Sequence, residues 1–331
     1  MNDLLCSGSL FRNHLVRALR LGFVAGLLGG CAPVSDSIYD PGDDPGDDSA
    51  GDASALGRTR YVPIEDVLDR EELATWAQVR TGLDNAFDDV CGDTFCGGDW
   101  SNLEPLDLSC SASTKRRQIR ECVWTFGASQ ELVDAGGSIA ASIPIFTCRF
   151  APKGAAHHLV RALAAGDPLR ALLPYSDESL YDVIGGCFGS PIGAEPLPED
   201  SALGPYVDAS DGLDENTVGA WYTMTGGLRS AYDESVAGET GVPHPLRLRC
   251  SEDENTRKLG TCTWVFAGAA TSIKSSGLHS VRAKRAACSF HVDATAVELA
   301  SSLAPEGEVG PLDRLLPGRD VTLRDELDAC L

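Results

Sequence analysis

The sequence lacks the features that several large classes of protein require. It contains 27 Lys and Arg against 49 Asp and Glu, a formal net charge of −22. Such a chain repels polyanions at long range and cannot form the dominant basic surface that counterion release needs, so we exclude nucleic acid as a partner. It also has no apolar run long enough to cross a bilayer as a mature helix. Any attachment to a membrane must therefore come from a lipid.

Motifs that mark common catalytic and metal sites are missing as well. The chain has no Gly-x-Ser-x-Gly elbow, phosphate-binding loop or His-Glu-x-x-His helix, and no two cysteines separated by two residues. The adjacent His157 and His158 diverge by about 100° on a helix, so they cannot easily face one metal. We therefore expect no catalytic residue, no metal and no cofactor.

The N-terminus resembles a bacterial lipoprotein signal. Three arginines precede the apolar segment Leu21–Leu28, and two glycines lead into Cys31. The resemblance implies a signal peptide over 1–30 and a lipidated, palmitate-bearing Cys31 at the start of the mature chain. The protein is then expected in the cell envelope, in the outer membrane if the host is Gram-negative. An ordinary secretory signal with an incidental cysteine is the alternative, and it exports the chain too.

Residues 31–58 are predicted to be the lipid anchor and an acidic tether. The segment is rich in Asp, Gly, Pro and Ser, with five aspartates between residues 40 and 48. Low hydrophobicity and like-charge repulsion keep such a composition extended and without a core.

The rest of the chain contains an internal repeat. Residues 105–150 align with 245–290 without a gap, and twelve of these 46 positions are identical, including three cysteines and one tryptophan. This similarity predicts a tandem duplication, with repeat 1 over 59–187, a linker over 188–214 and repeat 2 over 215–331.

Hydrophobic periodicity predicts that each copy is an α+β domain. In the first copy, spacing of three and four residues indicates helices, and alternation indicates strands. The predicted elements are a helix over 76–90, a hairpin of strands 106–110 and 122–126, a strand over 143–150, and helices over 155–165 and 178–187. Each copy should be an antiparallel sheet packed against helices, stabilised by disulfides.

Ten cysteines remain after the signal and Cys31, and in an exported chain they predict five disulfides. Cys91 and Cys96 have no equivalents in the second copy, so they should pair with each other. Two of the shared cysteines lie on one face of the predicted hairpin, close enough to bridge. The other predicted pairs are Cys110–Cys122, Cys148–Cys187, Cys250–Cys262 and Cys288–Cys330.

The stretch Cys91–Trp100 is the first candidate binding site. Its glycines permit tight turns, and Asp93 and Asp99 could supply oxygens to a calcium ion or, with Trp100, contact a partner. The alternative is a disulfide-stapled surface turn whose aspartates cap backbone amides. The stretch resembles loops of uncharacterised, cysteine-containing exported bacterial proteins, and this resemblance implies no activity.

A second candidate is the basic tip of the first hairpin. Arg116 and Arg117 lie there among other cations in an otherwise acidic chain. They could bind an acidic envelope protein or surface ligand, or they could simply be solvated.

Together these patterns predict a cell-envelope lipoprotein that is not an enzyme. It would act as a non-catalytic binding or structural module, attached to the membrane through its lipid. A secreted-type enzyme inhibitor is one alternative, because two copies can form a shared concave surface. An envelope hydrolase is the less favoured alternative, because it needs converging carboxylates or a Ser/His pair.

Overall fold

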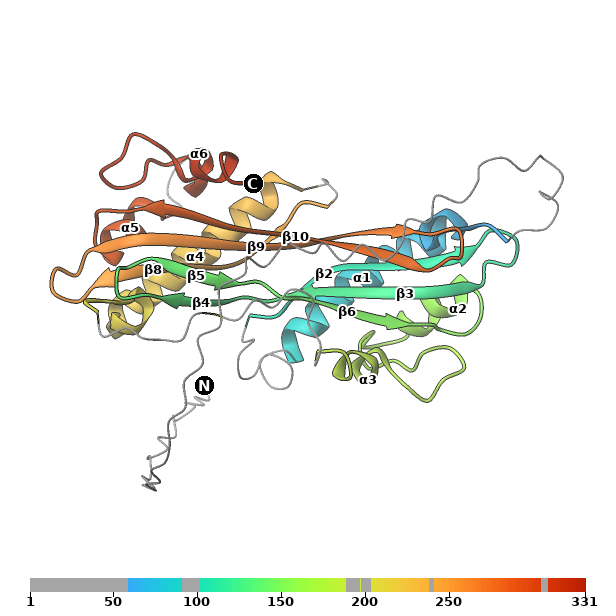
Figure 1. The fold of residues 1–331 in the computed structure, drawn as a ribbon. Helices are drawn as coiled ribbons and strands as arrows, with labels where there is room; N and C mark the ends of the chain where they lie inside the picture. Colours follow the sequence, from blue (N-terminus) through green and yellow to red (C-terminus); the bar gives the residue numbers. More distant parts are fainter. Residues whose placement is uncertain (1–58, 91–101, 189–196, 198–203, 238–240, 305–308) are drawn as a thin grey trace, which may run out of the picture. The chain divides into compact units, whose positions relative to one another are not determined.

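The computed structural model describes residues 59–90, 102–188, 197, 204–237, 241–304 and 309–331. All of them lie in one compact unit. They combine helices with antiparallel sheets and four disulfides, which confirms the α+β, disulfide-stabilised class (Figure 1). Within these ranges no helix has the length and apolar content needed to cross a membrane. Cys31 and the predicted tether lie outside the described residues.

The first half forms a four-stranded sheet with strand order β1-β2-β3-β6. Its elements are β1 (Tyr61–Pro63), η1 (Ile64–Val67), α1 (Arg70–Val90), β2 (Glu104–Ser113), β3 (Ile119–Gly127), β4 (Gln130–Val133), β5 (Ile139–Ser142), β6 (Ile145–Phe150), α2 (Ala156–Leu163) and α3 (Leu180–Gly185). The predicted hairpin is β2–β3, and the predicted third strand is β6, which pairs with β3.

Helix α1 begins at Arg70, earlier than the hydrophobic stripe predicts, because Asp69 caps it. The Asp69 carboxylate accepts from the backbone N–H of Glu72 at 2.9 Å, and the Glu72 side chain accepts from the Asp69 N–H at 3.0 Å. The apolar residues along one face of α1 are buried against the sheet. The ring centroid of Phe87 lies 4.9 Å from that of Phe126 on β3. The fully covered members of the stripe are Trp76, Val79, Leu83 and Phe87. Packing of this stripe holds α1 on the sheet.

The second half forms another four-stranded sheet, with strand order β10-β9-β8-β7, and its elements follow a similar order. They are β7 (Tyr206–Asp208), η3 (Ala209–Gly212), α4 (Glu215–Ser235), β8 (His244–Asp253), β9 (Leu259–Ile273), β10 (His279–His291), α5 (Ala296–Ser302), η4 (Pro311–Asp313) and α6 (Leu323–Asp328). Strand β7 lies within the predicted linker 188–214 and pairs with β8, so the second half starts before residue 215.

Four of the predicted disulfides are confirmed. Cys110 lies directly opposite Cys122 in the β2–β3 register, and their Cα atoms are 4.0 Å apart. The equivalent pair Cys250–Cys262 has a Cα separation of 3.9 Å. The pairs Cys148–Cys187 and Cys288–Cys330 tie β6 to the segment after α3 and β10 to the segment after α6. Cys91 and Cys96 lie outside the described residues.

Each half extends a hairpin that the sequence patterns do not predict. In the first half it is the separate two-stranded sheet β4–β5, and in the second it is the continuation of β9 and β10, which pair from His279↔Ile273 to His291↔Thr261. The strands β4 and β5 have only four residues each, too few for alternation to be read.

A small apolar cluster joins the two halves. It contains Ile143, Ile145, Leu246, Val265 and Ala267, and Leu106 and Ala283 pack against it. The backbones approach so closely here that a Cβ on Gly127 would lie 2.6 Å from the Cβ of Ala267. Each half therefore has its own core, and this third cluster is shared between them.

Candidate functional site

The extended hairpins anchor each half on the other. The turn between β9 and β10 rests on the first half, where the Ser111 hydroxyl donates to the Gly277 carbonyl at 2.5 Å. The turn between β4 and β5 rests on the second half, where the Ser251 hydroxyl donates to the Gly137 carbonyl at 2.7 Å. Ser111 and Ser251 are equivalent positions of the aligned copies, so the two contacts are reciprocal.

A cleft of about 410 Å³, here called the junction cleft, is lined by residues of both halves. Helix α4 supplies one wall and strand β8 another, while Asn102 and Glu104 come from the first half. The lining residues are Asn102, Glu104, Asp208, Ser210, Trp221, Tyr222, Thr225, Arg229, Leu246, Arg247, Leu248, Arg249 and Trp264.

Local periodicity explains why polar side chains gather in this cleft. On α4, Trp221, Thr225 and Arg229 follow one another at spacings of four residues, which places them on one face of the helix. On β8, Arg247 and Arg249 alternate with buried leucines, so both guanidinium groups project from the same face of the strand.

Carboxylates hold the arginines of the junction cleft in place. Arg229 Nη1 lies 2.6 Å from Glu104 Oε1, across the two halves. Arg249 Nε lies 2.7 Å from Asp208 Oδ2. Glu131 on β4 is buried below the cleft, 3.6 Å from Arg247 Nη1, and burial raises the pKa of its carboxyl despite that neighbour.

The junction cleft therefore combines directed polar groups with an aromatic surface. Three guanidinium groups face two wall carboxylates, Glu104 and Asp208, and the buried Glu131 lies 3.6 Å from Arg247 and 3.8 Å from Arg249, so each arginine has a carboxylate neighbour. Arg229 uses one of its five N–H donors on Glu104. The Tyr222 side chain is 65 % exposed at the wall, whereas Trp221 and Trp264 below it are almost covered.

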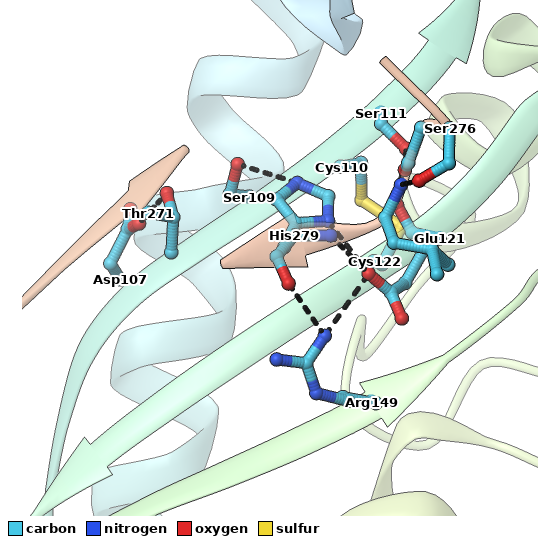
Figure 2. Close-up of polar contacts among 12 residues, drawn as sticks. Asp107, Ser109, Cys110, Ser111, Glu121, Cys122, Arg149, Thr271, Ser276 and His279 are labelled. Carbon is cyan, nitrogen blue, oxygen red and sulfur yellow. Dashed lines mark hydrogen bonds and ion pairs between the residues drawn. A yellow bond between two sulfur atoms is a disulfide. The ribbon is translucent and has the colours of Figure 1, made fainter. Parts of the chain in front are cut away.

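A second polar cluster fastens the β9–β10 turn to the first half (Figure 2). The backbone N–H of His279 donates to Glu121 Oε2 at 2.6 Å, and Nδ1 of its ring lies 3.1 Å from the same oxygen. Nε2 of the ring lies 3.1 Å from the Ser109 hydroxyl. Arg149 donates to both Glu121 Oε2 and the His279 carbonyl.

The protonation states of this cluster follow from its surroundings. Burial lowers the pKa of His279, and the nearby Glu121 only partly opposes this, so the ring is neutral near pH 7. Burial alone would raise the pKa of Glu121, but hydrogen bonds from His279 and Arg149 lower it overall. Nδ1 therefore donates to the carboxylate, and Nε2 accepts from Ser109.

Ser109, His279 and Glu121 thus have the connectivity of a nucleophile, a base and an orienting carboxylate. The ring of His279 is fully covered, and Glu121 Oε2 already receives two further donors. Among the clefts described for residues 59–331, none is lined by Ser109 or His279. The cluster is accordingly better suited to fixing the hairpin than to admitting a substrate.

The two predicted binding arginines, Arg116 and Arg117, have different surroundings in the structure. Arg116 is exposed at the β2–β3 turn. Arg117 has a φ of 55° in that turn and forms an ion pair with Glu72 on α1. Its guanidinium therefore ties the turn to the helix instead of facing a partner. The predicted ligands Asp93, Asp99 and Trp100 lie outside the described residues.

The residues of the junction cleft escaped prediction from the sequence. Their one signal is the pair Arg247 and Arg249, which replaces Asp107 and Ser109 of the first copy. Nothing in the sequence indicates that Glu104 meets Arg229, because 125 residues separate them.

Comparison with known proteins adds no relative: no family model, no curated protein and no solved structure matches this chain. In the part of the chain that the structure describes, no three His, Cys, Asp or Glu side chains converge as metal ligands.

Proposed function

We propose that this chain is an exported, lipid-anchored binding protein of the cell envelope, without a catalytic step, and that its ligand binds in the junction cleft. Four disulfides support export to an oxidising compartment. The lipid anchor at Cys31 and delivery to the outer membrane in a Gram-negative host rest on the signal sequence alone. The similar element order and the equivalent disulfides of the halves support an origin by tandem duplication.

The observation that carries the proposal is the gathering of three arginines around Tyr222 and Asn102 in a chain of net charge −22. Guanidinium forks recognise carboxylate and phosphate groups, and an exposed aromatic ring packs against the apolar face of a sugar. The ligand class that fits is an acidic, hydroxyl-rich molecule. In the envelope, glycans that carry carboxylates or phosphates have this chemistry.

Calorimetric titration tests the proposal. Oligoglucuronate should bind, and a neutral oligoglucose of the same length should bind at least tenfold more weakly. Arg229→Gln removes one fork, and Tyr222→Ala removes the exposed ring without touching the core. Each should weaken oligoglucuronate at least tenfold, about 1.4 kcal/mol. Arg116→Gln, an exposed arginine on another surface, is the matched control. Equal binding by Arg229→Gln, Tyr222→Ala and the wild type would refute the proposal.

A second candidate, an envelope hydrolase, is favoured by one observation, the chain of contacts from Ser109 through His279 to Glu121. A fluorophosphonate probe tests it directly, since an activated serine forms a covalent adduct. We expect no labelling at Ser109 because the base is covered. Labelling of the wild type that disappears in Ser109→Ala would establish the hydrolase instead.

A further inference from the structure

A second cleft lies at the equivalent position of the first half. It encloses about 580 Å³, and we call it the Asp84 cleft. A hollow of about 70 Å³ continues it to Trp124, the equivalent of Trp264 in the junction cleft. The lining residues are Arg80, Asp84, Leu106, Asp107, Gly241, Val242, His244, Ala269, Ala270, Thr271 and Lys284.

The charged positions of the two clefts are reversed. Aligning 76–88 with 221–233, and 104–150 with 244–290, brings several wall residues of one cleft onto wall residues of the other. The equivalent pairs are Asp84 and Arg229, Asp107 and Arg247, and His244 and Glu104. Two arginines of the junction cleft are thus replaced by carboxylates in the Asp84 cleft, and Glu104 is replaced by an imidazole.

One pair of wall residues is in contact in the junction cleft, and its equivalents are apart in the Asp84 cleft. Arg229 and Glu104 are in contact at 2.6 Å. Among the described residues, the equivalent Asp84 and His244 form no hydrogen bond or ion pair with each other or with any other side chain, although both line the same cleft. A carboxylate and an imidazole, both on exposed residues, therefore face the same space.

The cations in the wall are engaged by the protein. Arg80 Nη2 lies 3.4 Å from Asp107 Oδ1, and the Lys284 ammonium donates to the Gly241 carbonyl. Neither forms an ion pair with Asp84. Asp84 is an exposed residue, yet loss of water raises the pKa of its carboxyl to about 6; the charge of Arg80 opposes this shift and the acidic neighbours add to it.

We propose that the Asp84 cleft binds a cationic amine, with the Asp84 carboxylate as its counter-ion and His244 as a second polar contact. Leu106, Val242 and Ala269 supply an apolar wall for the carbon skeleton of the amine. The net charge of the chain attracts cations to the molecule as a whole. This site is separate from the junction cleft and takes a ligand of the opposite charge.

The test is a titration of the ¹⁵N-labelled protein with benzylamine, with benzyl alcohol as the neutral control, at pH 7.5 and pH 5. Benzylamine should shift the backbone amides of Val242 and Thr271 at pH 7.5. At pH 5 it should bind about tenfold more weakly, because Asp84 becomes protonated. The groups facing Asp84 are Arg80 and Asp88 on α1, Glu104 and Asp107 on β2, and His244 on β8.

Variants separate the contributions to this binding. Asp84→Asn should abolish benzylamine binding, and Asp84→Glu should retain it. His244→Gln should keep the pH dependence, which assigns it to Asp84 and not to the imidazole. Glu254→Gln, at an exposed turn, is the control. Binding by Asp84→Asn as tight as the wild type, or equal binding of benzyl alcohol, would overturn the proposal. Asp84→Asn should leave oligoglucuronate binding unchanged, so the two sites fail or succeed independently.

Discussion

The reciprocal hairpin turns predict a specific loss of stability when a methyl group is added at their tips. Gly277 has a φ of 83°, and a Cβ there would lie 2.6 Å from Cγ of Tyr61 and 2.7 Å from Cγ of Arg120. Both atoms are bonded directly to the Cβ of their side chains, so they can move away only if χ1 rotates or the backbone shifts. Gly277→Ala should therefore lose both backbone freedom and the close contact between halves.

The magnitude can be divided between these two causes. The left-handed conformation costs an alanine about 1–2 kcal/mol, and overpacking costs about 1–3 kcal/mol more. Gly318 provides the matched control, because its φ is 73° and a Cβ would meet nothing within 4 Å. Gly318→Ala should show only the first cost.

Urea unfolding followed by tryptophan fluorescence measures both variants. We expect the free energy of unfolding of Gly277→Ala to lie about 1–3 kcal/mol below that of Gly318→Ala. Gly137→Ala, whose Cβ would lie 2.8 Å from the Tyr206 ring, should behave like Gly277→Ala. If Gly277→Ala is as stable as Gly318→Ala, the turn does not pack closely against the first half.

Three further predictions concern stability. Ser111→Ala and Ser251→Ala should each lower the free energy of unfolding by about 1–2 kcal/mol, measured by urea unfolding, since each leaves a buried carbonyl without its donor; no loss in either would contradict this. Because the native pKa of His279 is lowered, the native state binds fewer protons than the unfolded chain, so stability should decline as the pH falls below about 6.5. The free energy of unfolding should change less between pH 5 and pH 8 in His279→Gln than in the wild type, and an equal change in both would count against the assignment. Replacing Cys148 and Cys187 together by serine should cost about 4 kcal/mol in the chain-entropy model, read from the shift in the urea midpoint, and an unchanged midpoint would argue against it.

The sequence predicted the parts of the fold that depend on local pattern. Alternation located β2, β3 and β6, and the stripe from Trp76 to Phe87 located α1. The pairing of Cys110 with Cys122 followed from two cysteines on one face of a hairpin, and the repeat carried it to the second half. Each of these inferences uses residues that lie close together in the chain or an internal copy of them.

The contacts between the halves could not be predicted in the same way. Strands β4 and β5 are too short for a clear pattern, and no sequence signal shows that their turn reaches Ser251. The arginines of β8 look like the solvated face of a strand until Glu104 and Asp208 are placed beside them. Such sites depend on how two sheets pack. Their residues lie more than a hundred positions apart in the chain, so no local pattern shows that they meet.

Hydrogen–deuterium exchange with and without oligoglucuronate tests the central claim, that the ligand binds in the junction cleft, most directly. The account predicts slower exchange in α4 and at the start of β8 around Arg247, and no change in the β2–β3 turn around Arg116. Protection confined to that turn, or no protection in the described ranges of the chain, would contradict it.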